Sequence, residues 1–151
     1  MPRAIGHVRT PYTKTSDIPK GLGAKHEAEG TIEVLPDFAE GLADLEGFSH
    51  LFILWVFDRS TDFDLIATPP ADEGRPHGVF ATRSPRRPNP IGLTVVELLR
   101  HDGAQLRVRG VDMLDGTPIL DIKPYLSSIS ENRIRRGWLA EAEKRRKSVT
   151  T

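Results

Sequence analysis

The sequence predicts an all-β fold: a small single-domain β-barrel with short helical additions and a C-terminal helix. Two observations carry this prediction. Six or seven short segments have the composition and period of strands, and turn residues separate them. Few segments repeat apolar residues at helical spacing. At 151 residues the chain is long enough for one hydrophobic core, so we expect one domain rather than two.

The first half of the chain supplies three expected strands. Residues 5–10 and 29–35 are strand-like, and the segment between them, through residue 23, has the composition of an exposed arm. Residues 36–42 predict a helical turn. Residues 48–57 are continuously apolar after His50, which indicates a strand buried on both faces or one that closes a barrel.

The second half supplies the remaining elements. Residues 78–83 predict a strand that enters a proline-rich loop, and residues 91–100 and 105–112 predict a hairpin with one wet face. A turn at residues 115–118 leads into a strand at 119–122, and residues 136–146 predict the last helix. We expect a barrel domain at residues 1–130 and a basic helix and tail at 131–151. This tail is either a solvated face or an RNA contact.

Composition narrows the function classes. The chain has 21 Lys and Arg against 21 Asp and Glu, so nucleic-acid contacts must be local. The absence of cysteine excludes thiol nucleophiles and cysteine-ligated metals. The N-terminal residues contain no apolar segment, and the longest apolar run, residues 51–57, is too short to cross a membrane. We expect a cytoplasmic protein without a membrane span.

Several kinds of site lack their usual patterns. The five histidines have no metal-ligand spacing, so we expect no metal. Ser49 and His50 are adjacent on an expected strand, which predicts side chains on opposite faces and a poor nucleophile–base pair. No glycine-rich phosphate loop of the usual kind is present.

Residues 83–92, with the sequence RSPRRPNPIG, are the most informative stretch. Three guanidiniums lie among three prolines that restrict the backbone, which predicts a rigid loop. Guanidiniums held in place suit a carboxylate or a phosphate. A proline-rich structural turn is the alternative.

A second unusual stretch is residues 112–125, DMLDGTPILDIKPY, in which three carboxylates, a lysine and a tyrosine lie around a tight turn. Its Asp-Gly turn is either architectural or part of a site. Asp121 and Lys123 lie two residues apart on one strand face, where an opposed charge pair is structural or holds a polar ligand. The spacing alone does not choose.

Taken in chain order, these stretches, with residues 5–12 and 47–51, resemble the TrmO-like (TsaA, YaeB) tRNA methyltransferases. The resemblance extends from about residue 3 to about residue 126. It implies a small β-barrel that binds S-adenosylmethionine and works as a homodimer. It also implies methylation of N6 of threonylcarbamoyl-adenosine at position 37 in the tRNA anticodon loop. Larger members of the family carry an additional C-terminal domain, whereas we expect residues 131–151 to form only the basic helix and tail.

The resemblance also implies cofactor contacts at nine positions: Arg83, Leu93, Leu114, Asp115, Gly116, Thr117, Pro19, Asp58 and Arg59. This chain departs from the family pattern at two places. Gly21 stands where members commonly have glutamine, and Asp58-Arg59 replaces His-Gln.

With that function in mind, we assign the other candidate residues as hypotheses. Arg86, Arg87 and Lys123 would receive RNA phosphate or the threonylcarbamoyl carboxylate. Asn89 would contact the base edge, and Asp115 or Asp121 would accept a proton.

Tyr12 and Tyr125 either stack on an unpaired base or pack in the fold. Two alternatives to the enzyme remain at this point. One is a sensor of S-adenosylmethionine or RNA without turnover, and the other is an unrelated small-molecule hydrolase.

Overall fold

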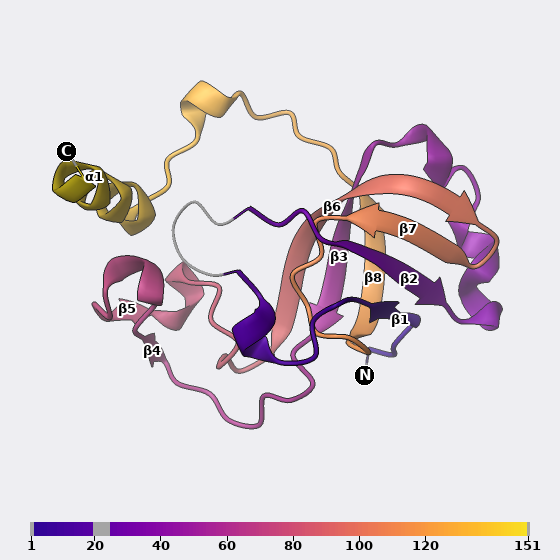
Figure 1. The fold of residues 1–151 in the computed structure, drawn as a ribbon, viewed down its shortest axis with the longest axis horizontal. Helices are drawn as coiled ribbons and strands as arrows, with labels where there is room; N and C mark the ends of the chain where they lie inside the picture. The colour runs from indigo at the N-terminus through magenta and orange to yellow at the C-terminus, as the bar shows by residue number, and fades with distance from the viewer. Residues whose placement is uncertain (1, 20–24, 151) are drawn as a thin grey trace.

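Six antiparallel strands form a closed barrel, which confirms the predicted fold class (Figure 1). The structure is a computed structural model that describes residues 2–19 and 25–150. In spatial order the strands are β1 (Gly6–Arg9), β2 (Glu29–Val34), β7 (Gln105–Arg109), β6 (Ile91–Asp102), β3 (His50–Val56) and β8 (Pro118–Pro124), and β8 pairs with β1 to close the ring.

Side chains fill the interior of the barrel. The inward positions alternate along each strand with outward ones, as the period of a strand requires. Seven inward side chains on the strands are completely buried: Val8, Ile32, Leu51, Ile53, Leu106, Val108 and Ile119. Each contributes about 1.5–3 kcal/mol of burial free energy. A barrel packed in this way has no internal ligand cavity, so any site must lie on its outside or at its ends.

Smaller elements lie beyond the strands of the barrel. Residues 64–83, here called the side lobe, contain the two-stranded sheet of β4 (Ile66–Ala67) and β5 (His77–Gly78) with the 3₁₀ turns η4 (Pro70–Asp72) and η5 (Val79–Ala81). The helix α1 (Trp138–Thr150) lies against this lobe, away from the barrel (Figure 1). Four further 3₁₀ turns complete the described chain: η1 (Thr15–Asp17), η2 (Pro36–Leu42), η3 (Leu45–Gly47) and η6 (Glu131–Arg133).

The predicted strand at residues 78–83 is wrong. Only His77 and Gly78 pair with β4, and the chain then turns into η5, closed by a hydrogen bond from the Thr82 amide to the Val79 carbonyl. Val79 is buried, whereas Phe80 is 76% exposed. Because the partner strand β4 offers only two residues, the strand hydrogen bonds cannot continue beyond Gly78. The residues that follow form the hydrogen bonds of a local turn instead.

The predicted burial of β3 on both faces is also wrong. Leu51, Ile53 and Trp55 face the core, but the residues between them are only half-buried. The apolar outward face is partly covered by neighbours, because the ring of Phe52 packs 5.0 Å from that of Tyr125. The alternative prediction, that this segment is a strand of a closed barrel, is correct.

The other predicted strands are confirmed, with shifts at their ends. The hairpin of β6 and β7 forms with Asp102 opposite Gln105, and its register shifts between Leu98 and Arg100. β7 stops at Arg109, before the predicted end, because Gly110 takes a positive φ of 108° that breaks the extended backbone. The last helix begins at Trp138, two residues later than predicted, and extends to Thr150.

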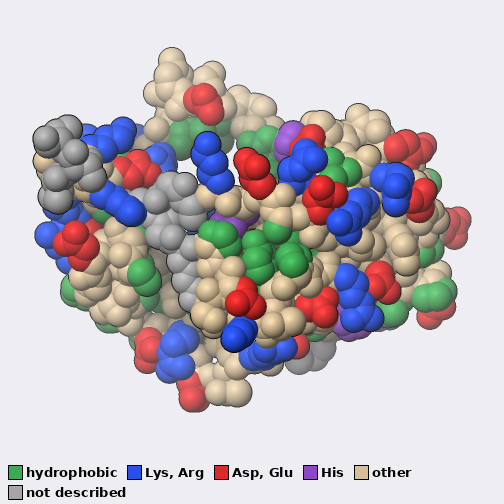
Figure 2. All heavy atoms as spheres, in the orientation of Figure 1, with side chains coloured by type: hydrophobic (Ala, Val, Ile, Leu, Met, Phe, Trp, Pro, Cys, Tyr) green, Lys and Arg blue, Asp and Glu red, His purple; other side chains and the backbone are tan. Residues whose placement is uncertain are grey.

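Cross-strand ion pairs neutralise the barrel surface. Arg9 pairs with Glu33 at 2.7 Å, and Arg109 pairs with Glu97 at 2.9 Å. Figure 2 shows acidic and basic side chains interspersed over this face rather than separated by sign. Exposed pairs of this kind contribute little stability, but they leave the barrel wall without a broad basic surface.

No helix in the described residues is long and apolar enough to cross a membrane. The proposed division at residue 130 stays a prediction. The helix beyond it contacts the side lobe.

Gly92 allows the indole of Trp55 to lie across β6. The two residues are paired in the β3–β6 register, and a Cβ on Gly92 would lie 2.3 Å from the indole ring. A Cβ atom cannot lie that close to a ring carbon. Position 92 therefore requires glycine because the indole occupies the space of a side chain, and not because the backbone turns there.

We therefore predict that Gly92→Ala lowers the free energy of unfolding by about 1–3 kcal/mol, because the indole must move in a packed wall. The matched control is Gly47→Ala, where a Cβ would meet nothing within 4 Å, and we expect a change below about 0.5 kcal/mol. Urea denaturation of both variants measures the difference. Equal midpoints for the two would contradict the packing argument.

Candidate functional site

A cleft of about 1120 Å³ lies between one end of the barrel and the side lobe with α1. Its lining combines guanidiniums, carboxylates and apolar side chains from segments far apart in the sequence. The residues are Ile18, Pro19, His26, Asp64, Ile66, Ala67, Thr68, Pro69, Pro70, Ala71, Phe80, Ala81, Thr82, Arg83, Ser84, Pro85, Arg86, Asp112, Arg136, Trp138, Leu139 and Glu143. Apolar walls with a few polar groups are typical of small-molecule and cofactor sites.

Three arginines of the cleft differ in their partners. Arg136 is held by both carboxylate oxygens of Glu143 at 2.6 Å, and Arg86 donates to Asp64 at 2.8 Å. Arg83 has no hydrogen-bond or ion-pair partner among the described residues. Its guanidinium is therefore available to an anionic ligand, as the sequence hypothesis requires.

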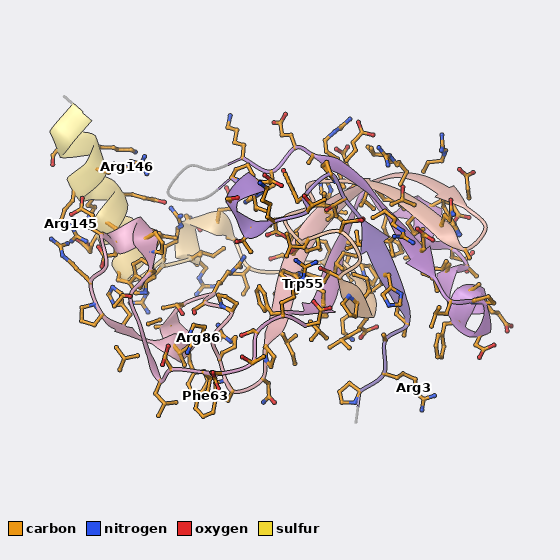
Figure 3. All side chains as sticks on the ribbon, turned by 60° about the horizontal axis from the view of Figure 1, so that its bottom comes forward. Arg3, Trp55, Phe63, Arg86, Arg145 and Arg146 are labelled. Carbon is orange, nitrogen blue, oxygen red and sulfur yellow. The ribbon has the colours of Figure 1, made fainter. Side chains whose placement is uncertain are left out.

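Contacts from neighbouring segments brace the proline-rich loop. Arg87 donates from Nη1 to the carbonyls of Thr82 and Ser84, at 2.8 and 3.2 Å. Ser60 Oγ donates to the Pro85 carbonyl at 3.1 Å. Arg87 thus supports the loop from inside, and the structure does not place it in the cleft, whereas Arg83 and Arg86 line it. Figure 3 shows Arg86 on the lobe side of the molecule, close to Phe63.

The barrel contributes a hydrogen-bond chain to the cleft. Trp55 Nε1 donates to Thr94 Oγ1 at 3.0 Å, and Thr94 Oγ1 donates to Asp112 Oδ1 at 2.6 Å. Trp55 and Thr94 are buried, and Asp112 lines the cleft. Figure 3 shows Trp55 at the side of the barrel that faces the lobe. The chain runs from the core and ends on a carboxylate at the ligand-accessible surface.

The wall formed by α1 is anchored on a buried carboxylate. Asp72 is only 3% exposed and accepts hydrogen bonds from His77 Nε2 at 2.6 Å and from Arg145. The hydrogen bond from His77 is the main cause that lowers the pKa of Asp72. Trp138 stacks on His77 at 4.4 Å and donates to the Ala81 carbonyl at 2.7 Å.

Most of the other implied cofactor residues lie elsewhere. Pro19 lines the cleft, whereas Leu93 is 44% exposed on the outer face of β6. Asp58 and Arg59 are exposed in the turn after β3, next to the loop that Ser60 braces. Gly21 lies outside the described residues.

The turn at residues 114–117 is tied to β1 rather than to the cleft. The Asp115 amide donates to the Tyr12 carbonyl, and Asp115 Oδ1 accepts from the Thr10 amide at 3.0 Å. Thr117 is buried and donates to the Leu114 carbonyl at 2.6 Å. Gly116 lines a second, smaller hollow of about 430 Å³ beside β1 and β2. These hydrogen bonds give the Asp-Gly turn a structural role, and the cofactor contacts implied for residues 114–117 stay a prediction.

The remaining candidates also lie away from the cleft. Lys123 pairs with Asp121 at 3.4 Å on β8, the opposed pair that the spacing predicts. Tyr12 packs against the core, and Tyr125 packs on Phe52 while remaining 45% exposed. Asn89 is exposed in the proline-rich loop and does not line the cleft. The structure thus brings together three of the residues named from the sequence, Pro19, Arg83 and Arg86, and separates the others from them.

The prediction that Ser49 and His50 point apart is wrong. Ser49 Oγ and His50 Nδ1 are hydrogen-bonded at 2.8 Å. Ser49 precedes β3, so strand alternation does not apply to it. Both side chains are exposed, and neither lines the cleft. Among residues 2–19 and 25–150, no group of His, Asp and Glu side chains is arranged to hold a metal ion.

Sequence reasoning missed three contributors to the cleft: His26, Trp138 and Asp72, which anchors α1. Asp112 was noted only as one of the carboxylates of residues 112–125, and nothing in the spacing tied it to Thr94, 18 residues away. Trp138 was noted only as an apolar position of the last helix. These links are tertiary and have no local signal.

Comparison with known proteins assigns the family. The sequence model described as the tRNA-methyltransferase O N-terminal domain matches residues 7–131, most of the chain. The chain belongs to the tRNA-methyltransferase O family. The resemblance expected from the arginine-rich loop and the DGTPILDIKPY stretch is thereby confirmed.

Proteins from several organisms are similar to this chain. A probable S-adenosyl-L-methionine-binding protein of Pyrococcus abyssi is 48% identical over 91% of this chain and 74% of its own length. The tRNA (adenine(37)-N6)-methyltransferase of Escherichia coli is 40% identical over 81% of this chain and 56% of its own length. The crystal structure of TrmO from Pseudomonas aeruginosa superposes with a TM-score of 0.72 at 36% identity, over 91% of this chain and 60% of that one. The chain thus spans about three-fifths of the length of these two longer relatives.

In this family member, we predict that Asp72→Asn loosens α1. The variant loses the carboxylate that accepts hydrogen bonds from Arg145 and His77, so amide exchange in the helix should accelerate by on the order of tenfold or more. Hydrogen exchange read by mass spectrometry measures this. Asp102→Asn, which removes an exposed partner of Arg100, is the control and should leave α1 unchanged.

The same contact predicts a pH dependence. Because the pKa of Asp72 is lowered in the folded protein, its contribution is fully present above the ordinary pKa of aspartate and is lost as pH falls through the lowered value. The Asp72 carboxyl therefore keeps its charge between about pH 5 and 8, and its protonation should not alter amide exchange in α1 of the unaltered protein over that range.

For the Asp72→Asn variant, amide exchange in α1 as slow as in the unaltered protein would contradict the anchoring role.

Proposed function

We propose that this protein is an S-adenosylmethionine-dependent methyltransferase that acts on N6 of adenosine 37 in tRNA. Membership of the tRNA-methyltransferase O family supports this, as do relatives named for that reaction and for binding S-adenosyl-L-methionine. The single structural observation that carries the proposal is the cleft, where the unpartnered guanidinium of Arg83 lies among apolar walls.

The residues of the cleft fit the cofactor. S-adenosylmethionine combines a carboxylate, an ammonium, a sulfonium and a flat adenine. Arg83 suits the carboxylate, and the apolar and aromatic side chains of Phe80 and Trp138 suit the adenine or the thioether carbons. At about 1120 Å³, the cleft is larger than one such molecule needs, which leaves room for a nucleobase beside it.

When bound, the cofactor supplies an electrophilic methyl group. The work left to the protein is positioning, which is worth as much as about 7–11 kcal/mol when the reacting atoms are held in line. The braced loop under Arg83 and the anchored wall of α1 provide fixed surfaces for this. The filled barrel provides a third wall that does not give way.

The RNA would approach from the lobe side. Arg86 and Arg136 line the cleft there, and the basic tail continues from it along α1. Both guanidiniums already have carboxylate partners. They would bind RNA at the edge of the cleft by exchanging those carboxylates for phosphate groups. Arg87, Lys123 and Tyr125 stay as outlying candidates, because none of them lines the cleft.

The substrate we propose in finer detail is threonylcarbamoyl-adenosine, whose carboxylate Arg86 would receive. We also propose a homodimer. Its support is the row of exposed apolar side chains on the outer face of β6, Ile91, Leu93 and Val95, each 41–44% exposed. Such a stripe is typical of a protein interface. Leu93, an implied cofactor contact outside this cleft, would lie in that interface. A tRNA substrate is consistent with the expected cytoplasmic location.

Incubation with S-adenosylmethionine and tRNA carrying threonylcarbamoyl-adenosine tests the function directly. We expect a mass increase of one methyl group on that nucleoside, read by mass spectrometry of the digested tRNA. The archaeal relatives named only as binding proteins favour a second candidate, a sensor without turnover. A sensor would bind the cofactor and leave the nucleoside unchanged.

The role of Arg83 gives a separate prediction. Arg83→Ala should weaken S-adenosylmethionine binding by roughly tenfold or more, the usual loss for a hydrogen-bonded charged group. Arg100→Ala is the control, because Arg100 pairs with Asp102 on the barrel and does not line the cleft. Isothermal titration calorimetry measures both. Unchanged affinity in Arg83→Ala would refute the assignment.

A further inference from the structure

The carboxylate of Asp112, which lines the cleft, has one oxygen with a hydrogen-bond partner in residues 2–19 and 25–150 and one without. The direction of its hydrogen-bond chain is fixed, because the indole Nε1 of Trp55 can only donate. Thr94 Oγ1 therefore accepts from the indole and directs its own proton to Asp112 Oδ1, 2.6 Å away. The second oxygen, Oδ2, has no hydrogen-bond or ion-pair partner among the described residues.

A second polar atom near Asp112 also lacks a partner. His26 lines the same cleft, and its Nδ1 is shielded from solvent with no hydrogen bond within the described part of the chain. The Ala28 carbonyl accepts from the amides of Gly110 and Val111, which holds the segment of His26 beside that of Asp112. A buried polar atom left without a partner is costly, and a ligand group would remove that cost.

We propose that Asp112 determines base specificity by accepting a hydrogen bond, through Oδ2, from the exocyclic amino group of the substrate adenine. This inference rests on the proposed function. Adenine presents an N6–H donor next to a ring-nitrogen acceptor on its exposed edges. The Asp112 carboxylate meets the donor, and His26 Nδ1, in the ring tautomer that carries its proton on that atom, meets the neighbouring acceptor.

The two carboxylates that the sequence suggests as proton acceptors already have partners. Asp115 Oδ1 accepts from the Thr10 amide, and Asp121 pairs with Lys123 and accepts from the Ile122 amide. Neither lines the cleft. Asp64 and Glu143 do line it, but each is paired with an arginine. Asp112 is thus the cleft carboxylate whose described partner is an uncharged hydroxyl.

Because the direction of the hydrogen-bond chain from Trp55 through Thr94 is fixed, Asp112→Asn replaces the acceptor Oδ2 by a donor. Thr94 still directs its proton at position 112, so the amide oxygen turns toward Thr94 and the amide NH₂ takes the place of Oδ2. An acceptor in the cleft becomes a donor. The variant should therefore prefer a base with an oxygen at C6, such as hypoxanthine, over adenine.

The experiment measures binding of anticodon stem-loop RNA with adenosine or inosine at position 37, by fluorescence anisotropy with S-adenosylhomocysteine present. We expect the unaltered protein to prefer adenosine by about tenfold, and Asp112→Asn to prefer inosine. Asp112→Ala should bind both with similar affinity. A preference for adenosine retained in Asp112→Asn, or the absence of one in the unaltered protein, would overturn the proposal.

Two Thr94 variants test the positioning role of the chain. Thr94→Val keeps the shape but removes the hydroxyl, so the preference for adenosine should fall several-fold, whereas Thr94→Ser should restore it. Equal discrimination in Thr94→Val and the unaltered protein would contradict positioning through Thr94. Melting temperatures of both variants report any loss of folding separately.

Cofactor binding distinguishes the remaining explanation. In the alternative, Asp112 contacts the adenine of the cofactor. The Asp112→Asn variant will then prefer S-inosylhomocysteine to S-adenosylhomocysteine, and its discrimination between the two RNAs will be unchanged. That result overturns the proposal. Failure of the proposed function has a different signature. The unaltered protein would then discriminate between the two RNAs without methylating tRNA, and the recognition inference would stand by itself.

Discussion

Closure of the barrel between β8 and β1 is the constraint on which the other features depend. The two strands pair at only two positions, Gly6 with Ile119 and His7 with Pro118. Loop contacts extend this short seam, because the Gly116 amide donates to the Val8 carbonyl and the Asp115 side chain accepts from the Thr10 amide. A closed sheet has no free edge, so the seam removes an aggregation-prone edge and fixes where the turn at residues 114–117 can lie.

Closure around a filled interior moves the chemistry to one end of the barrel. At that end the last residues of β3, the first residues of β6 and the chain after β7 converge, because these strands are antiparallel neighbours. Trp55, Thr94 and Asp112 meet there. The space that Gly92 leaves for the indole makes this possible. A polar chain can therefore leave an otherwise apolar core without stranding a buried donor.

The side lobe and α1 supply the opposite wall and depend on charge more than on a core of their own. The lobe has a sheet of only two paired residues per strand, too small to be stable by itself. Asp72, buried beneath His77 and Arg145, joins lobe and helix, and the stacking of Trp138 on His77 completes the contact. Residues of the proline-rich loop and of the basic tail thus become two sides of one cleft.

The strand pattern by itself determined the barrel, because alternation in segments such as residues 105–109 records which face meets a core, and an apolar run such as residues 50–56 indicates a strand of the barrel. The composition of residues 83–92 separately pointed to Arg83 and Arg86, because guanidiniums among prolines are a local signal. The strand predicted at residues 78–83 did not form, since an apolar segment does not show whether a partner strand exists. The links from Thr94 to Asp112 and from Asp72 to Arg145, 73 residues away, were decided only by tertiary structure. Hydrogen bonds across such separations depend on how strands and lobes pack, and no local pattern in the chain encodes them.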